Sequence, residues 1–364
     1  MPHPRLTIRG LRVRAVNLPM ARPLQTSSVL VSVAPLVLLD LFTEEGVTGS
    51  SYLFCYTPLA LKPVVQMLLN LEQVIQGDLA APLDLERKLQ ARFRLLGAKG
   101  VVGMALAGID MAAWDALARA QGLPLATLLG AAPRNIPAYN SCGLGLMGAE
   151  RAAAEAEELL VDGFSALKLR LGYPDAQTDA EVARAVRHAV GDSVRIMSDY
   201  NQALSVAEAS KRCAALADQG LQWIEEPTLA DDYAGHAQIR AKSTTPIQMG
   251  ENWWGAQEMA KCLAAGACDL GMPDAMKIGG VTGWLRAAAI AETASLPISS
   301  HLFPEVSAHL LAASPTGHWL EYVDWANPIL QEPVKIENGQ AVIGDAPGSG
   351  VAWDEAGVAR YLAA

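Results

Sequence analysis

The chain has 364 residues, of which 51% are hydrophobic and 18% are charged. This composition is typical of a soluble globular protein with one large domain or two ordinary ones. The net charge of −10 argues against nucleic acid as a partner and, more weakly, against an anionic membrane surface. The five cysteines are an odd number and form no Cys-x-x-Cys pair, so we expect reduced thiols in a cytoplasmic protein.

The start of the chain predicts neither export nor a membrane span. Residues 1–20 lack the apolar core of a secretory signal. The most apolar run, residues 29–42, contains Pro35 and Asp40 and is too short to cross a bilayer. We therefore expect this run to be a strand of the core.

Up to residue 131 the chain mixes strand and helix patterns. The sequence Glu44-Glu45-Gly46 follows the apolar run and predicts a hairpin turn. Residues 59–76 and 101–122 have helical patterns, and the second is ended by Gly122 and Pro124. Residues 1–131 are therefore expected to form an α+β unit.

From residue 132 onward, short apolar stretches alternate with Ala-rich amphipathic stretches. The expected strands are residues 137–142, 165–171, 194–200, 221–226, 246–251, 268–275, 298–303 and 318–323. Strands that alternate with helices in this way predict a parallel sheet that closes into a barrel over residues 132–326. The last segment, 327–364, returns to a turn-rich β pattern with a short helix, and we expect it to rejoin the N-terminal unit.

Charged side chains stand at or near the C-terminal ends of most predicted barrel strands. They are Lys168, Arg170, Asp199, Glu225, Glu251, Asp274, His301 and Glu321. A single charged residue at such a position is usually a helix cap or half of a rim ion pair. The C-terminal strand ends of a βα barrel meet at one mouth, where active sites lie, so a full set in register favours an active site.

Three of these residues, Asp199, Glu225 and Glu251, place carboxylates on successive strands. They would repel one another unless a cation lay between them, and oxygen ligands without sulfur favour Mg²⁺. Asp274 and His301 fall on adjacent strands and suggest a dyad. A carboxylate bound to one imidazole nitrogen fixes the tautomer and raises the basicity of the ring, so His301 is a candidate general base.

Several longer stretches resemble one family nearly end to end. The chain is similar to the mandelate racemase subgroup of the enolase superfamily in APLVLLDL, SYLFCYTP, AGIDMAAWDALA, SDYNQAL, WIEEPTL, MGENWWG, MPDAMKIGGVTGW, SSHLF and HWLE. The resemblance implies an α+β capping domain and a (β/α)7β barrel, with Mg²⁺ on the three carboxylates. It also implies a homo-oligomer, commonly an octamer.

The same resemblance implies roles for individual residues. Lys168 would lie against the substrate carboxylate, the His301–Asp274 dyad would be one base, and Glu321 would be a protonated acid bonded to the developing enediolate. Ser141 and Asn201 would contact the substrate. Residues 21–31 would form a mobile specificity loop, with Leu24 and Arg22 as its substrate contacts.

Arg170 departs from the family pattern. Lys168 and Arg170 are two apart on a strand and so share one face, whereas the family has Lys-x-Lys, with the second lysine as base for the opposite enantiomer. An arginine is rarely deprotonated. We therefore expect Arg170 to clamp a carboxylate or hydroxyl, or to assist a leaving group, rather than to act as a base. The alternative is a tolerated variant without consequence.

The sequence thus predicts an Mg²⁺-dependent enzyme that removes the α-proton of a 2-hydroxy carboxylate, with His301 as the main base. Racemisation of a mandelate-like acid competes with dehydration of a sugar acid. A non-catalytic binding protein on the same scaffold is a further alternative. A nicotinamide enzyme is another, because residues 143–148, GLGLMG, match Gly-x-Gly-x-x-Gly, although no clean dinucleotide-binding unit follows.

Overall fold

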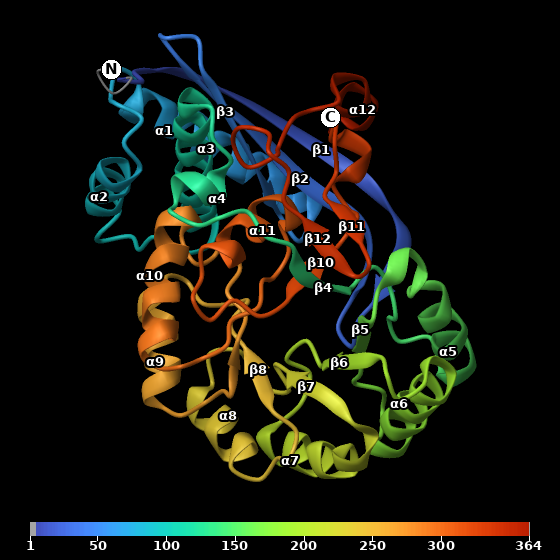
Figure 1. Cartoon of the computed structure of the whole chain (residues 1–364). Helices are drawn as coiled ribbons and strands as arrows, with labels where there is room; N and C mark the ends of the chain where they lie inside the picture. Colours follow the sequence, from blue (N-terminus) through green and yellow to red (C-terminus); the bar gives the residue numbers. More distant parts are fainter. Residues whose placement is uncertain (1–4, 364) are drawn as a thin grey trace.

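The computed structural model describes residues 5–363 and has two units, an N-terminal capping unit and a barrel (Figure 1). The capping unit is built on an antiparallel sheet of three strands in the order β1-β2-β3. These are β1 (Ile8–Gln25), β2 (Leu30–Thr43) and β3 (Thr48–Phe54), followed by a 3-10 turn η1 (Pro58–Ala60) and the helices α1 (Leu61–Ile75), α2 (Pro82–Arg92), α3 (Gly100–Gln121) and α4 (Leu125–Leu128).

The capping unit confirms the predicted strand, hairpin and helices. The apolar run is β2, which pairs with β3 across the turn that contains Gly46. Helix α3 ends where Gly122 takes a left-handed φ of 66°, a conformation that glycine adopts without steric cost. Among the described residues α3 is the one helix long and apolar enough to cross a membrane, but 78% of its apolar window is buried inside the protein.

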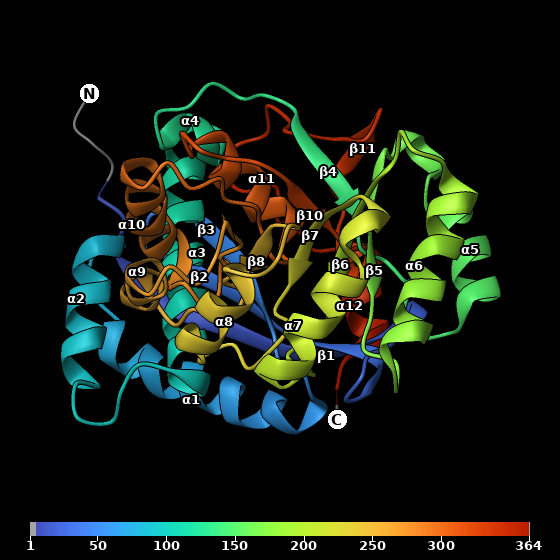
Figure 2. The same cartoon turned by 90° about the horizontal axis from the view of Figure 1, so that it is seen from below.

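The barrel follows as parallel strands that alternate with helices (Figures 1 and 2). The strands are β4 (Ile136–Asn140), β5 (Ala166–Arg170), β6 (Arg195–Asp199), β7 (Leu221–Glu225), β8 (Ile247–Met249), β9 (Leu270–Gly271) and β10 (Leu320–Tyr322). The helices are α5 (Ala149–Glu158), α6 (Ala176–Val190), α7 (Val206–Ala215), α8 (Tyr233–Arg240), α9 (Ala256–Ala264), α10 (Gly280–Thr293) and α11 (Pro304–Ala312), with 3-10 turns η2 (Val161–Gly163) and η3 (Ala217–Gln219). Strands β4 to β9 pair in chain order, and β10 pairs with β4.

The predicted seventh strand, residues 298–303, is shorter than expected. It forms isolated bridges, from Ile298 to Gly271 and Gly317 and from His301 to Asp274. These bridges lie on both sides of the segment and complete the ring between β9 and β10. The segment ends early because Leu302 and Phe303 take positive φ values of 51° and 49°, which turn the chain into α11.

The C-terminal segment contacts both units. It contains the 3-10 turn η4 (Asn327–Ile329), the hairpin β11 (Lys335–Glu337) and β12 (Gln340–Val342), and helix α12 (Glu355–Tyr361). Strand β12 pairs with β4 of the barrel, whereas Trp353 donates through Nε1 to Asp40 of β2 at 2.7 Å. The domain boundaries at residues 131 and 326 stay a prediction.

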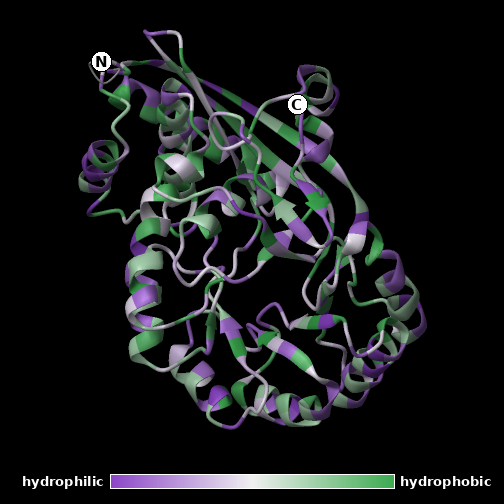
Figure 3. Ribbon diagram, viewed as in Figure 1, coloured by the Kyte–Doolittle hydropathy of each residue, from purple (hydrophilic) through white to green (hydrophobic). Residues whose placement is uncertain are grey.

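The layers of the barrel explain how the sequence positions the site. Outer helices carry apolar and polar residues around their circumference (Figure 3), so that each covers the sheet with one face. Tyr139, Met197, Trp223 and Met272 fill the interior of the barrel. The charged residues predicted for the mouth follow these interior positions along the strands.

The capping unit reaches the barrel mouth through the end of the β1–β2 hairpin. The backbone N–H of Leu146, in the loop after β4, donates to the carbonyl of Gln25 at 2.8 Å. A Cβ on Gly145 would lie 2.7 Å from the backbone nitrogen of Gln25, so glycine allows this close approach. Within GLGLMG, this glycine therefore serves the contact between the two units.

Candidate active site

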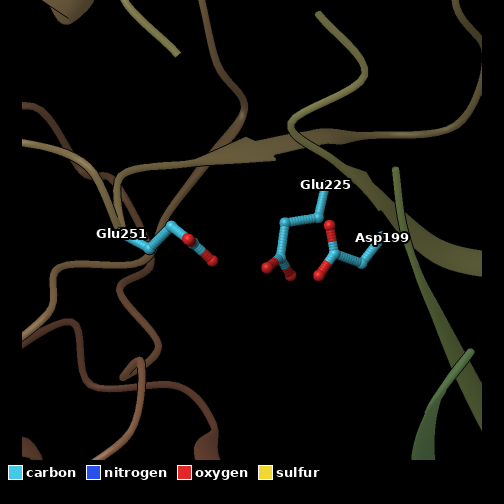
Figure 4. A group of neighbouring side chains, drawn as sticks. All are labelled: Asp199, Glu225 and Glu251. Atoms are coloured by element: carbon cyan, nitrogen blue, oxygen red, sulfur yellow. The ribbon is translucent and has the colours of Figure 1, made fainter. Parts of the chain in front are cut away.

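Three carboxylates from neighbouring barrel positions meet at the mouth, as predicted. Asp199 ends β6, Glu225 ends β7, and Glu251 lies two residues beyond β8. Each offers an oxygen within 4.8 Å of the others. Figure 4 shows their carboxyl groups directed toward a shared space.

This group fits a divalent cation. Burial raises the pKa of Asp199, and burial together with the neighbouring carboxylates raises the pKa of Glu225 to about 8, although Lys168 opposes both shifts. The protein environment thus resists negative charge on these two groups, whereas burial would raise the pKa of Glu251 but His301 and Lys277 lower it. Because all the ligand atoms are oxygens, the set suits Mg²⁺.

Lys168 lies at the centre of the acidic groups. Its Nζ atom is 2.6 Å from Glu321, 3.0 Å from Glu225 and 3.5 Å from Asp199, and the residue is 1% exposed. Burial by itself would lower the pKa of Lys168, but these carboxylates raise it above its ordinary value. The amine is therefore held as an ammonium ion.

Arg170 shares the interior face of β5 with Lys168, and both are buried. Its guanidinium donates to the main-chain carbonyls of Gly143, at 2.8 Å, and of Ser141 and Lys168, at 3.2 and 3.4 Å. A further N–H donates to Ser141 Oγ at 2.7 Å. Within the described chain Arg170 thus clamps a hydroxyl and the loop after β4, and its Nε atom is buried without a partner.

His301 and Asp274 form a dyad. His301 Nδ1 lies 2.7 Å from Asp274 Oδ2, and the other oxygen of Asp274 accepts the N–H groups of Met276 and Lys277, each at 2.8 Å. The aspartate is therefore fixed on both sides, and the imidazole points Nε2 toward the carboxylates, 3.3 Å from Glu251. Burial would lower the pKa of His301, but Glu251 and Asp274 raise it to about 9.

Glu321 lies between the lysine and the dyad. Its Oε1 accepts from Lys168 at 2.6 Å and Ser141 at 2.8 Å, and its Oε2 accepts from the backbone of Leu302 at 2.9 Å. Burial would raise its pKa, but Lys168 and His301 lower the pKa of Glu321 to about 2. The adjacent Lys168 ammonium favours the ionised form here, and the protonated Glu321 that the family resemblance implies stays a prediction.

The predicted substrate contacts Ser141 and Asn201 both lie at the mouth. Ser141 Oγ accepts from Arg170, so its own proton is donated to Glu321. Asn201 donates to both oxygens of Asp199, from its backbone at 2.8 Å and from Nδ2 at 2.9 Å. Asn201 therefore orients a carboxylate of the cluster, and its contact with a substrate stays a prediction.

The expected specificity loop, residues 21–31, is largely the end of the β1–β2 hairpin. Leu24 pairs with Val31 and is 6% exposed. Arg22 lies 3.4 Å from Glu158 of α5, and both side chains are partly exposed. Strand pairing holds the backbone at Leu24 and Val31. Substrate contacts by Leu24 and Arg22 stay predictions.

Sequence reasoning missed four residues beside the cluster: Tyr56, Glu226, Asn252 and Lys277. Asn252 Nδ2 donates to Glu226 at 2.8 Å and lies 3.3 Å from Glu251, and its Oδ1 accepts from Lys277 Nζ at 2.6 Å. The ring of Tyr56 lies 4.3 Å from the same ammonium. The available signal was that Glu226 and Asn252 directly follow predicted metal ligands in WIEEP and MGENWWG.

A small apolar cavity of about 10 Å³ lies between the two units near the turn that follows His301. Its lining comes from β2, β3, that turn and the loop after β10: Leu36, Tyr52, Phe54, Leu302, Phe303, Val323, Trp325 and Ala326. The rings of Phe54 and Trp325 are 5.1 Å apart and so join the two units. The cavity is too small for a substrate group and is a packing gap between the two units.

Family models match both units of the chain. The model described as mandelate racemase / muconate lactonizing enzyme, N-terminal domain, matches residues 8–130, and the model described as enolase C-terminal domain-like matches residues 151–357.

Solved structures and a curated relative cover nearly the whole chain. An enolase from alpha proteobacterium bal199, with bound Mg, is 46% identical with a TM-score of 0.97 and coverage of 98% of this chain and 100% of its own. An enolase from Bradyrhizobium, complexed with magnesium and mandelic acid, is 45% identical with a TM-score of 0.95 and coverage of 99% of both chains.

The L-talarate/galactarate dehydratase of Salmonella typhimurium is 29% identical over 96% of this chain and 89% of its own. A structure of that dehydratase, liganded with Mg and L-lyxarohydroxamate, has 27% identity and a TM-score of 0.92, and covers 99% of this chain and 94% of its own.

Proposed function

Because the chain belongs to the mandelate racemase/muconate lactonizing enzyme subgroup of the enolase superfamily and is a Mg²⁺-dependent enzyme acting on carboxylates, we propose that it removes the α-proton of a 2-hydroxy carboxylate from one face, with His301 as the base. The observation that carries this proposal is the position of Glu321. One of its oxygens faces Lys168, at 2.6 Å, and the other faces His301 Nε2, at 3.9 Å. The Glu321 carboxylate thus lies between the candidate base, His301, and the ammonium group of Lys168.

His301 takes the proton at Nε2 from its neutral form; the Glu251 charge that raises the pKa of His301 is a charge that the cation held by Glu251 would offset. Asp274 accepts from Nδ1, which holds the reactive tautomer and stabilises the imidazolium once the proton has moved. Asp274 is in turn fixed by two backbone N–H groups. The base is therefore oriented before a substrate arrives.

The opposite side of the site has no matching base among the described residues. Lys168 is held as an ammonium by three carboxylates, and the guanidinium of Arg170 is bound to main-chain oxygens and Ser141. Lys168 and Arg170 would place positive charge beside the substrate, which gains negative charge as its α-proton leaves. This arrangement supports proton transfer at one face of the substrate rather than symmetric exchange at both faces.

Asp199, Glu225 and Glu251 would hold the Mg²⁺ ion. When bound, the ion supplies positive charge that stabilises negative charge on the substrate carboxylate as the α-proton leaves. Lys168 adds a second positive charge near the same carboxylates. Glu321 and Ser141 supply hydrogen-bonding groups between the two sides.

The relatives, rather than a cavity of this structure, support the choice of substrate class. The Bradyrhizobium relative is complexed with mandelic acid. A mandelate-like acid is therefore the first candidate. Dehydration of a sugar acid is the second, because the Salmonella relative is a dehydratase and one base with a cationic partner suffices for loss of a β-hydroxyl.

Solvent deuterium exchange tests the proposal. With Mg²⁺ present, a small library of 2-hydroxy acids should exchange the α-hydrogen of one enantiomer, as followed by NMR and product analysis. The His301→Asn variant should lose exchange by several orders of magnitude but keep its fold and Mg²⁺ affinity, because no metal ligand is removed. Normal exchange in this variant would place the base elsewhere.

The proposed assembly is a homo-oligomer, an octamer by the family resemblance, and the proposed location is the cytoplasm. Sedimentation velocity of the purified protein measures the first, and fractionation of the native cells measures the second.

A further inference from the structure

Lys277 is a buried cation beside the site that the proposed chemistry does not use. It lies in the turn between β9 and α10 and is 7% exposed. Its backbone is fixed at both ends: the N–H donates to Asp274 at 2.8 Å, and the carbonyl accepts from Gly255 at 3.1 Å. The position of this lysine is therefore tied to the dyad and to the loop that carries Glu251.

Two groups fix the side chain of Lys277. Its Nζ donates to Asn252 Oδ1 at 2.6 Å and lies 4.3 Å from the ring centre of Tyr56, a residue of the capping unit. The Tyr56 ring packs at a tilt of 55° against Phe54, with ring centres 4.6 Å apart. A cation placed over an aromatic face is attracted by the ring electrons, so the capping unit helps to hold the ammonium in place.

The hydrogen bond from Lys277 decides which way the Asn252 amide points. An ammonium can only donate, so it requires the amide oxygen on its side. The amide nitrogen must then face the carboxylates, where Nδ2 lies 2.8 Å from Glu226 and 3.3 Å from Glu251. Without the lysine, the amide could rotate and turn an oxygen toward two carboxylates.

The Asn252 amide also serves a second buried carboxylate. Glu226 is buried beside the metal cluster, and one of its oxygens accepts from Asn252 Nδ2 at 2.8 Å. Its other oxygen has no partner among the described residues. A turned Asn252 amide would therefore leave Glu226 without this donor as well.

We propose that Lys277 is a positioning residue for the metal site: held by Tyr56 of the capping unit, it orients the Asn252 amide, which holds Glu251 in place for Mg²⁺. The proposal concerns metal binding without substrate, so it can fail or succeed independently of the proposed reaction. Groups that orient metal ligands typically change metal affinity by about 10- to 100-fold when removed.

Calorimetric titration of Mg²⁺ into the metal-free protein tests the proposal. Lys277→Met and Asn252→Leu should each raise the Kd for Mg²⁺ by about 10- to 100-fold. The double variant should be no worse than the weaker-binding single variant, because both changes act through one chain of contacts. Lys277→Arg keeps a cationic donor and should retain most of the affinity.

The direction of the effect separates positioning from simple electrostatics. If Lys277 acted only as a nearby positive charge, its removal would tighten Mg²⁺ binding. Unchanged or tighter binding in Lys277→Met would therefore overturn the proposal, and so would additive losses in the double variant. If Lys277→Met does not fold, Asn252→Leu and Lys277→Arg still decide the question.

Lys99→Met is the matched control. Lys99 also joins the capping unit to the barrel, through Glu258 at 2.9 Å, but this pair does not touch the carboxylate cluster. The control should leave the Kd unchanged. An equal loss in Lys99→Met would assign the effect to general docking of the capping unit, which contradicts a specific role for Lys277.

Discussion

Single residues carry the proposal that proton transfer occurs at one face of the substrate. Lys168 and Arg170 occupy one face of β5, yet their partners differ. Lys168 contacts three carboxylates, whereas Arg170 contacts main-chain carbonyls and the hydroxyl of Ser141. A guanidinium in such a network has no reason to lose its proton near neutral pH, since arginine is effectively always charged in proteins.

Chiral analysis of Arg170→Lys tests this assignment. The wild type should exchange the α-hydrogen of one enantiomer of a mandelate-like acid rapidly and the other slowly, because each pKa unit of mismatch costs about 1.4 kcal/mol. Arg170→Lys should raise racemisation if the substrate is mandelate-like. It should lower turnover if the natural reaction is dehydration of a sugar acid, since the clamp on Ser141 is lost. Fast, symmetric exchange by the wild type would show that Arg170 acts as a base.

At the scale of elements, helix α11 joins the barrel to the capping unit. His309, in its last turn, accepts the backbone N–H of Ala126 in α4 through Nδ1 at 3.1 Å. This contact satisfies a donor at the start of a short helix, where no intrahelical partner exists. It requires the imidazole to be neutral at Nδ1.

The stability of the protein should therefore fall as the pH drops below about 6.5. Burial lowers the pKa of His309 to about 4, so the unfolded chain binds more protons than the folded chain between these values. At pH 5 the loss from this residue is about 2 kcal/mol. Urea unfolding at pH 5 and pH 7 measures it.

Two variants assign this pH dependence to His309. His309→Asn keeps an acceptor near the Nδ1 position and cannot gain the proton, so it should reduce the pH dependence even if it lowers stability at both pH values. His188→Asn alters an exposed histidine of α6 and should leave the dependence unchanged. Equal pH dependence in all three proteins would rule out His309 as its source.

At the scale of the whole molecule, the mouth is a junction where strand ends of the barrel and the edge of the capping unit meet. The carboxylates of the cluster come from three strands, and the neighbouring aromatic surface includes Phe54 and Tyr56 of the capping unit. A cation bound only by the folded arrangement stabilises that arrangement by mass action.

Removal of Mg²⁺ should therefore abolish turnover and lower the unfolding temperature, and added Mg²⁺ should restore both. At a concentration of 100 times the Kd, the stabilisation is about 2.7 kcal/mol. Thermal unfolding with and without EDTA measures it. Glu251→Gln should remove most of the Mg²⁺-dependent shift, whereas turnover that survives exhaustive chelation would refute the metal assignment.

Much of the site was predictable because chemistry and strand periodicity coincide along the chain. Acidic residues that end successive apolar strands repel one another at a barrel mouth. Asp199, Glu225 and Glu251 therefore indicated a bound cation from the sequence alone. The same reasoning paired Asp274 with His301, and the structure places them 2.7 Å apart. Strand β2 and the end of α3 followed equally from local patterns.

Tertiary structure alone decided the features that depend on partners distant in sequence. The partners of Glu321 are Lys168, Ser141 and the backbone of Leu302, which come from other parts of the barrel. The orientation of Asn252 follows from Lys277, which is 25 residues away in the chain. Strand and helix periodicity predicts the face on which a side chain lies. It does not predict which residues, distant in sequence, contact that side chain. The sequence by itself therefore determined the family, the fold and the residue types at the barrel mouth, whereas contacts between residues distant in sequence decided how those side chains are oriented.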